Sequence, residues 1–94
     1  MNKYESIIIV NPSVDDDQLK KLKDDVTALI NKDGKLEKIE DMGKKKLAYE
    51  VKKNSEGIYV KFLFEANPTL ITELERNYRI IDEIIKFIDV RVEE

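Results

Sequence analysis

The sequence predicts an α+β fold whose elements follow the order strand, helix, strand, strand, helix, strand. Two segments carry apolar residues at helical spacing, and each follows a run rich in β-branched residues that ends at an Asn-Pro pair. Between them, and again near the end of the chain, apolar and polar residues alternate with a period of two, which is typical of half-buried strands. Since the chain has 94 residues, we expect residues 1–94 to form a single domain.

The first strand is predicted over residues 4–10, with the sequence YESIIIV. Its apolar side chains occupy both alternations, so the strand is expected to be buried on both faces and to lie centrally in a sheet. Asn11-Pro12 ends it, because Pro12 has no N–H to donate to a neighbouring strand.

The start of the first helix is marked by Asp15 and Gln18, which have the spacing of a capping box, with Ser13 as an alternative cap. Gly34 is expected to end this helix in the left-handed conformation that glycine adopts readily. The residues predicted to form its buried stripe are Leu19, Leu22, Val26, Leu29 and Ile30.

A long second strand is predicted over residues 35–53, with a bend or bulge near Gly43. Asn54 to Gly57 is predicted to be a hairpin turn. Residues 58–66 (IYVKFLFEA) are rich in aromatic and β-branched residues and should form the third strand.

The second helix is expected to begin with Asn67 as its cap and Pro68 at the first helical position, where the missing N–H costs nothing. The isoleucines between residues 80 and 85 could prolong this helix, whereas the alternation of residues 88–92 predicts a fourth strand. Its buried stripe is predicted to contain Leu70, Ile71, Leu74, Tyr78 and Ile81.

This order of elements is the ferredoxin-like layout, in which a four-stranded antiparallel sheet carries both helices on one face. No helix of this chain is left to cover the opposite face, so we expect another molecule to dock there. Tyr4, Tyr49 and Tyr59 are assigned to this protein-partner face.

The composition argues against catalysis. The chain has no Cys and no His, which excludes thiolate and imidazole chemistry, and its three glycines lack phosphate-cradling spacing. Asp15-Asp16-Asp17 should complement the dipole of the first helix rather than hold a metal, because adjacent helical residues point about 100° apart. We expect no enzyme activity, no cofactor and no metal.

Two further features predict where the protein is found. No apolar run approaches the ~20 residues that cross a bilayer, and the opening residues are too acidic for a signal peptide. The lack of Cys fits a reducing compartment. We therefore expect a cytoplasmic protein without a membrane partner.

Charge is distributed unevenly along the chain. The formal net charge of −3 argues by itself against a nucleic-acid partner. Residues 35–53 nevertheless hold seven lysines and four acidic residues, whereas the remainder holds ten basic and sixteen acidic ones. Lys44-Lys45-Lys46, beside the predicted bend, is either a solvated loop or a set of side chains that project together toward phosphates.

The third strand faintly resembles the aromatic strand with which RNA-recognition modules stack bases. That pattern has a basic residue before its glycine and an aromatic residue after it, where this chain has Glu56 and Ile58. Tyr59, Phe62 and Phe64 are therefore interpreted as sheet core or as a protein-docking face.

Distinctive stretches are spread over essentially the whole chain: Lys3-Tyr4-Glu5 leading to Asn11-Pro12, GKKKLAY at 43–49, EGIY at 56–59, LERNYR at 74–79 and VRVE at 90–93. Together they resemble the bacterial small-subunit ribosomal protein S-six family. The resemblance implies a ferredoxin-like ribosomal protein that binds the central domain of small-subunit ribosomal RNA together with ribosomal protein S-eighteen. RNA contacts are then implied at Lys3, Lys44, Lys45, Lys46, Arg79, Lys86 and Arg91.

Other functions stay open on the same fold. A regulatory module could dimerise through its open sheet and bind a small metabolite, although the sequence has no glycine-rich ligand loop. An acylphosphatase-like enzyme would need an arginine in the loop after the first strand, and residues 11–14 contain none.

Overall fold

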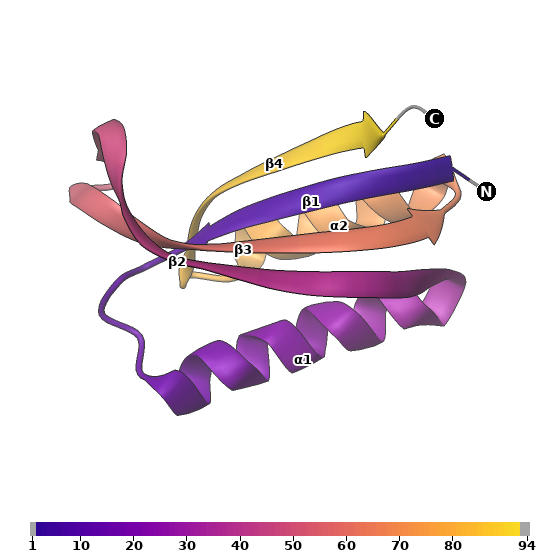
Figure 1. Ribbon diagram of the computed structural model, residues 1–94, viewed down its shortest axis with the longest axis horizontal. Coiled ribbons are helices and arrows are strands. Elements are labelled where there is room, and N and C mark those ends of the chain that lie inside the picture. Colours follow the sequence, from indigo (N-terminus) through magenta and orange to yellow (C-terminus); the bar gives the residue numbers. More distant parts are fainter. Residues whose placement is uncertain (1, 93–94) are drawn as a thin grey trace.

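The computed structural model describes residues 2–92, which form strands and helices in the predicted order (Figure 1). The elements are β1 (Asn2–Val10), α1 (Asp16–Asp33), β2 (Gly34–Val51), β3 (Asn54–Ala66), α2 (Pro68–Ile80) and β4 (Ile84–Val92). The predicted ferredoxin-like α+β fold is confirmed.

The four strands form one antiparallel sheet in the order β2-β3-β1-β4, so β1 is central as predicted. Residues directly opposite each other in such a sheet point to the same face. Ser6 lies opposite Phe62, and Ile8 opposite Val60. All four are fully buried, so this face packs against the helices.

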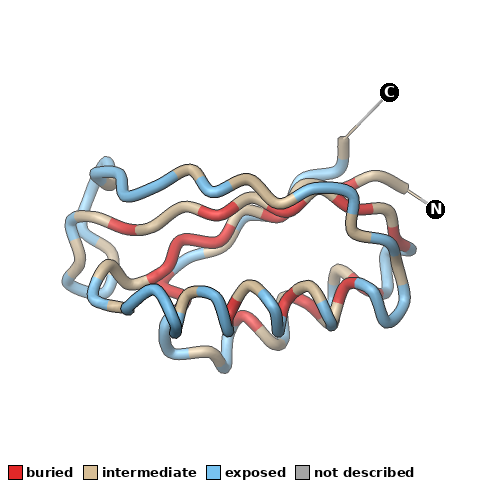
Figure 2. Tube along the Cα trace, turned by 60° about the horizontal axis from the view of Figure 1, so that its bottom comes forward, coloured by how far each residue is buried: buried red, intermediate tan, exposed pale blue. Residues whose placement is uncertain are grey.

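The core fills the space between the sheet and the two helices, which lie together on one side of it (Figure 2). Figure 2 also shows buried positions recurring along both helices and along the central strands. The helices contribute Leu22, Val26, Ile30, Leu70, Leu74 and Tyr78, which are the buried members of the two predicted stripes. The remaining members, Leu19, Leu29, Ile71 and Ile81, are partly buried against the same core.

The capping box of α1 is confirmed. The Gln18 backbone N–H donates to Asp15 Oδ1 at 2.7 Å, and the Asp15 backbone N–H donates to Gln18 Oε1 at 3.0 Å. These bonds satisfy donors that have no partner within the helix.

Gly34 follows the last residue of α1, as predicted, but the predicted left-handed conformation is wrong. Gly34 has φ −154° and is the first residue of β2, so it does not end α1 in a left-handed conformation. A Cβ at this position would lie 2.5 Å from the carbonyl oxygen of Glu65. Glycine is needed here because the backbone of β3 lies very close to the first residue of β2, immediately after α1 ends.

The hairpin turn lies earlier than predicted. Lys52 and Lys53 have positive φ values of 48° and 66°, and Val51 pairs with Asn54 across them. A two-residue turn with two positive φ values matches the twist of the flanking strands. Residues 54–57, predicted to be the turn, belong to β3 instead.

The predicted bend in β2 is present, since Gly43 has φ 79° and the register with β3 shifts between Asp41 and Gly43. α2 begins at Pro68, and Asn67 occupies the cap position without a capping hydrogen bond from its side chain. β4 begins at Ile84 rather than at Ile88.

A β-bulge explains the early start of β4. Val10 pairs with Ile84 and Ile9 pairs with Lys86, so Ile85 is an extra residue on β4. Ile84 and Ile85 are both buried. Two consecutive buried residues hide the alternation from which the strand was predicted.

Candidate nucleic-acid and partner interface

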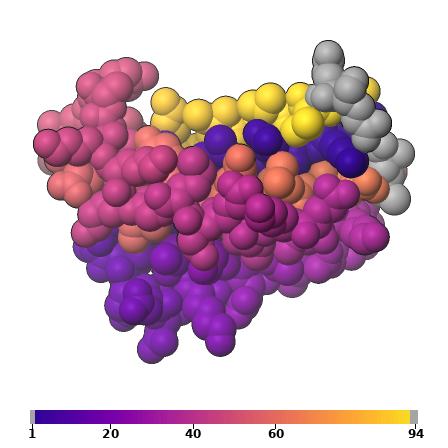
Figure 3. Space-filling view, in the orientation of Figure 1, coloured from indigo at the N-terminus to yellow at the C-terminus, as the bar shows by residue number. Residues whose placement is uncertain are grey.

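Beyond the bend at Gly43, the hairpin of β2 and β3 continues as an arm formed by residues 44–57, which we call the hairpin arm. Figure 3 shows it standing out from the body of the molecule. It carries five lysines and two acidic residues. The arm is therefore the basic end of an acidic chain.

The predicted lysine triplet lies on this arm, and all three residues are exposed. Lys45 pairs with Gly57, and its Nζ lies 5.8 Å from the ring centroid of Tyr59. Successive residues of a strand point to opposite faces, so Lys44 and Lys46 lie on the other side of the arm. The three side chains thus do not project together, which argues against the second of the two alternatives that the sequence left open.

A second group of cations combines Lys52 of the arm with residues of α2 and β4. Lys52, Arg79 and Lys86 come from the hairpin turn, the end of α2 and the start of β4, and they line one hollow of about 300 Å³. The other residues lining it are Tyr78, Ile84, Ile85 and Phe87, none of them acidic. We call this site the basic hollow.

Aromatic rings connect the two groups of cations. Lys86 Nζ lies 5.7 Å from the ring centroid of Tyr49 on the arm, and Arg79 Cζ lies 5.7 Å from that of Phe87. Across the sheet, Tyr59 pairs with Ile9, which pairs with Lys86. These contacts bring Lys45, Tyr59, Tyr49 and Lys86 together at the hairpin end of the sheet.

The structure separates the two other predicted RNA contacts from this surface. Lys3 pairs with Glu65 and Val92, and the Arg91 guanidinium donates to Asn2 Oδ1 at 3.0 Å. Both residues lie at the opposite end of β1 and β4, roughly 20 Å away along the strands. The set of basic residues implied by the resemblance thus divides into a larger and a smaller group.

Lys52 is the residue of the basic hollow that sequence reasoning missed. Its signal was present, because Lys52-Lys53 continues the charge bias of the lysine-rich segment. Placing the hairpin turn at residues 54–57 left these lysines at the end of a strand, where nothing connected them to Arg79 and Lys86.

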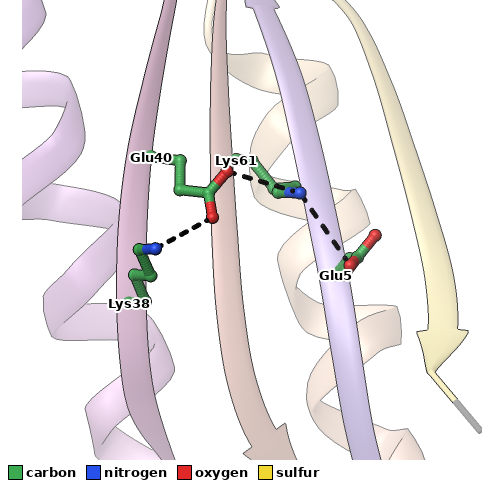
Figure 4. Close-up of polar contacts among 4 residues, drawn as sticks. All are labelled: Glu5, Lys38, Glu40 and Lys61. Atoms are coloured by element: carbon green, nitrogen blue, oxygen red, sulfur yellow. Dashed lines mark ion pairs between the residues drawn. The ribbon is translucent and has the colours of Figure 1, made fainter.

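The face of the sheet opposite the helices, here called the open face, has a charged half and an apolar half. In the charged half, Lys61 Nζ lies 3.9 Å from Glu5 Oε1 and 3.4 Å from Glu40 Oε2, and Lys38 Nζ lies 3.2 Å from Glu40 Oε1 (Figure 4). Glu40 accepts a hydrogen bond from Lys38 and lies near the Lys61 ammonium group. These two interactions hold the pKa of Glu40 below its ordinary value.

The apolar half of the open face lies toward β4. Ile88, opposite Ile7, is 42% exposed, and Val90, opposite Glu5, is 47% exposed. Exposed aliphatic side chains grouped on one sheet face are typical of a docking surface.

The three tyrosines assigned to a partner face lie in different places. Tyr49 is 69% exposed on the hairpin arm, and Tyr59 is half-buried beside it. Tyr4 is buried on the helix side, with its ring centroid 5.9 Å from that of Phe64. Its assignment to the partner face is therefore corrected, because the register of β1 turns it into the core.

One buried polar cluster lies beneath β4. The hydroxyls of Ser6 and Tyr78 are hydrogen-bonded at 2.8 Å, and both carboxylate oxygens of Asp89 are buried without a hydrogen-bond partner among the described residues. Burial raises the pKa of Asp89 to about 6, opposed by the Ser6 hydroxyl and reinforced by the Glu75 carboxylate. Burial likewise raises the pKa of Tyr78.

Known proteins resemble this chain in both sequence and structure. A sequence model of the family described as Ribosomal protein S6 matches residues 3–91. The chain belongs to the ribosomal protein S6 family. The small ribosomal subunit protein bS6 of Helicobacter hepaticus is 44% identical over 94 residues, covering 99% of this chain and 69% of that protein.

Two further S6 proteins support the assignment. The bS6 protein of Clostridium kluyveri is 42% identical over 95 residues, which cover 100% of both chains. A crystal structure of the 30S ribosomal protein S6 from Thermotoga maritima matches with a TM-score of 0.91 and 36% identity, covering 97% of this chain and 87% of that one.

Membership of the S6 family makes this chain a structural protein of the small ribosomal subunit and not an enzyme, as the sequence predicted. Among residues 2–92, no helix is long and apolar enough to span a membrane. Within the same described part of the chain, no group of three or more acidic side chains is placed to hold a metal ion.

Proposed function

We propose that this S6 protein binds the central domain of small-subunit ribosomal RNA through the hairpin arm and the basic hollow, and binds ribosomal protein S-eighteen through its open face. The observation that carries the RNA proposal is the meeting of Lys52, Arg79 and Lys86, from three elements, in a hollow whose lining has no acidic residue. The proposal places the protein on ribosomes in the cytoplasm.

The basic surface fits a phosphate backbone better than it fits base edges. Lysine ammonium groups act as point charges without bidentate geometry, so they position RNA rather than read its sequence. Because Lys44 and Lys46 lie on one side of the arm and Lys45 on the other, the arm presents ammonium groups to phosphates on both of its sides. Lys3 and Arg91 would supply a second contact at the far end of the sheet.

Partner binding is supported by the apolar half of the open face. Ile88 and Val90 lie on it with large exposed fractions, and Tyr49 and Tyr59 lie beside it at the arm. With a net charge of −3, the chain should bind RNA only weakly by itself. A partner on the open face would then supply much of the binding free energy.

The test is the salt dependence of binding to a central-domain RNA fragment in the presence of S-eighteen. Replacing Lys44 and Lys45 by alanine should reduce the slope of log K against log salt by about 1 to 2, because each lysine releases counterions when it neutralises a phosphate. The matched control is Lys20→Ala with Lys32→Ala, which removes the same charge from α1 and should leave the slope unchanged.

Two outcomes would contradict the proposal. Equal slopes for the arm variant and the α1 variant would show that RNA does not contact the arm. Absence of the protein from small subunits separated on a density gradient would show that the chain acts elsewhere.

A further inference from the structure

The helix side of the molecule carries a groove that adjoins the basic hollow at Tyr78, which lines both, and otherwise lies outside the proposed RNA and partner surfaces. α1, α2 and the turn before β4 line two adjoining hollows of about 300 and 470 Å³. The hollows share Asp25 and Ile81, so together they form one depression, here called the helix groove. Elsewhere the two helices are joined by an ion pair, with Lys32 Nζ 3.8 Å from Glu73 Oε1.

The lining of the helix groove combines an apolar floor with an acidic rim. Aliphatic side chains form the floor, among them Leu22, Val26, Leu29 and Ile81. Asp25, Asp82 and Glu83 contribute three carboxyl groups to the rim, against the single ammonium group of Lys21. The groove is therefore apolar inside and negative at its edge.

Ile80 adds an exposed anchor to this groove. It lies at the last position of α2, lines the larger hollow and is 74% exposed, the largest exposed fraction among the exposed large hydrophobic residues described. A buried position for Ile80 would remove much of that aliphatic surface from water, which favours formation of a complex. The fold of the isolated chain does not supply such a position.

The charge of the rim decides the class of partner. Carboxylates repel the phosphates of RNA, and an acidic segment of a protein would meet the same repulsion. A segment with apolar residues at helical spacing and with lysine or arginine beside them would fill the floor and neutralise the rim. Since α2 is 13 residues long, or about 20 Å, a matching helix would have about twelve residues.

We propose that the helix groove is a docking site for a basic amphipathic helix of another protein. This site differs from the basic hollow in the sign of its charge, and Tyr78 is the one residue that both linings share. It would allow the chain to hold a protein neighbour on its helix side while its hairpin end contacts RNA.

The test uses the isotopically labelled full chain and two synthetic peptides of about twelve residues, one of Leu and Lys and one of Leu and Glu in the same amphipathic pattern. The Leu-Lys peptide should shift the backbone amide signals of Leu22, Asp25 and Ile81. Ile80→Ser should weaken its binding about tenfold while leaving the melting temperature and the RNA salt slope unchanged.

A matched pair of charge variants isolates the rim. Asp25→Asn with Asp82→Asn should weaken binding of the Leu-Lys peptide, whereas Asp17→Asn with Asp33→Asn removes the same charge outside the groove and should have little effect. Equal binding of the Leu-Glu peptide, signal shifts confined to the open face, or self-association of the chain through this groove would each overturn the proposal. If the peptide test fails but Ile80→Ser keeps the parent chain's salt dependence of RNA binding, the RNA proposal is unaffected by that failure.

Discussion

Gly34 shows how one residue can be required for space rather than for backbone conformation. Its φ of −154° is accessible to any residue, but the Glu65 carbonyl oxygen lies where a Cβ would point. Gly43 is the opposite case, since it has φ 79° and nothing within 4 Å of an added Cβ. Glycine is therefore required at two positions of β2 for different reasons, for space at Gly34 and for a positive φ at Gly43.

Alanine substitutions separate these two demands. Gly34→Ala should lower the free energy of unfolding by about 2 to 3 kcal/mol, because the obstructing atom belongs to the backbone of β3 and cannot rotate away. Gly43→Ala should cost only about 1 kcal/mol, the strain of a left-handed non-glycine residue. Urea unfolding of both variants measures the difference, and an unchanged midpoint for Gly34→Ala would contradict the close approach.

At the scale of elements, the sequence predicted boundaries that depend on neighbouring residues, and missed boundaries that lack a local signal or depend on pairing between distant strands. The start of α1 could be read from the sequence because Asp15 and Gln18 satisfy each other within one turn. The hairpin turn could not, because Lys52-Lys53 has no glycine or asparagine to mark positive φ values. The start of β4 was hidden by its bulge, which pairing with β1 creates.

The same distinction applies to the candidate site. The sequence identified lysine and arginine as the residue types, but grouping Lys52 with Arg79 and Lys86 requires the tertiary fold. The direction in which Tyr4 points depends on the register of β1, which places it opposite Phe64. A shift of one residue would have turned it to the open face.

The capping box of α1 can be tested against its neighbour. Asp15→Ala removes the acceptor for the Gln18 N–H and should lower the free energy of unfolding by about 1 kcal/mol. Asp17→Ala removes a carboxylate from the same turn without a capping bond and should cost only a few tenths of a kcal/mol, the share of the helix dipole. Thermal unfolding at neutral pH compares them, and equal losses would assign the effect to charge alone.

At the scale of the whole molecule, charge and apolar surface are divided among separate regions. The hairpin end is basic, the helix groove is rimmed by carboxylates, and the apolar half of the open face lies toward β4. The net charge of −3 hides this division. Basic, acidic and apolar regions that are separated in this way suit different classes of partner.

The buried carboxyl of Asp89 gives the folded protein a pH dependence. Its pKa is raised to about 6 by burial, so between about pH 4 and pH 6 the folded state holds a proton that the unfolded state releases. The contribution of Asp89 therefore favours folding below pH 4, declines as the pH rises to 6 and is constant above that. Asp89→Asn should remove this decline.

Unfolding of both proteins between pH 4 and pH 7 measures this effect. At pH 7, Asp89→Asn should be more stable than the parent chain by about 1 to 2 kcal/mol, less than the full pKa difference because the residue as a whole is only half-buried. At pH 4 the two should be nearly equal. The control is Asp33→Asn, which removes the same charge from an exposed position. A constant difference across the range would contradict the titration of Asp89.

The position of Asp89 has a further consequence for how the free protein behaves at high concentration. β4 is an edge strand, and a long edge with exposed Ile88 and Val90 invites a second chain to add its own strand. Inward-facing charged residues on an edge strand disfavour such pairing, and Asp89 of β4 faces the helix side of the sheet, opposite Ser6. We therefore expect the same carboxylate that lowers the stability of the fold to disfavour the addition of a second strand at this edge.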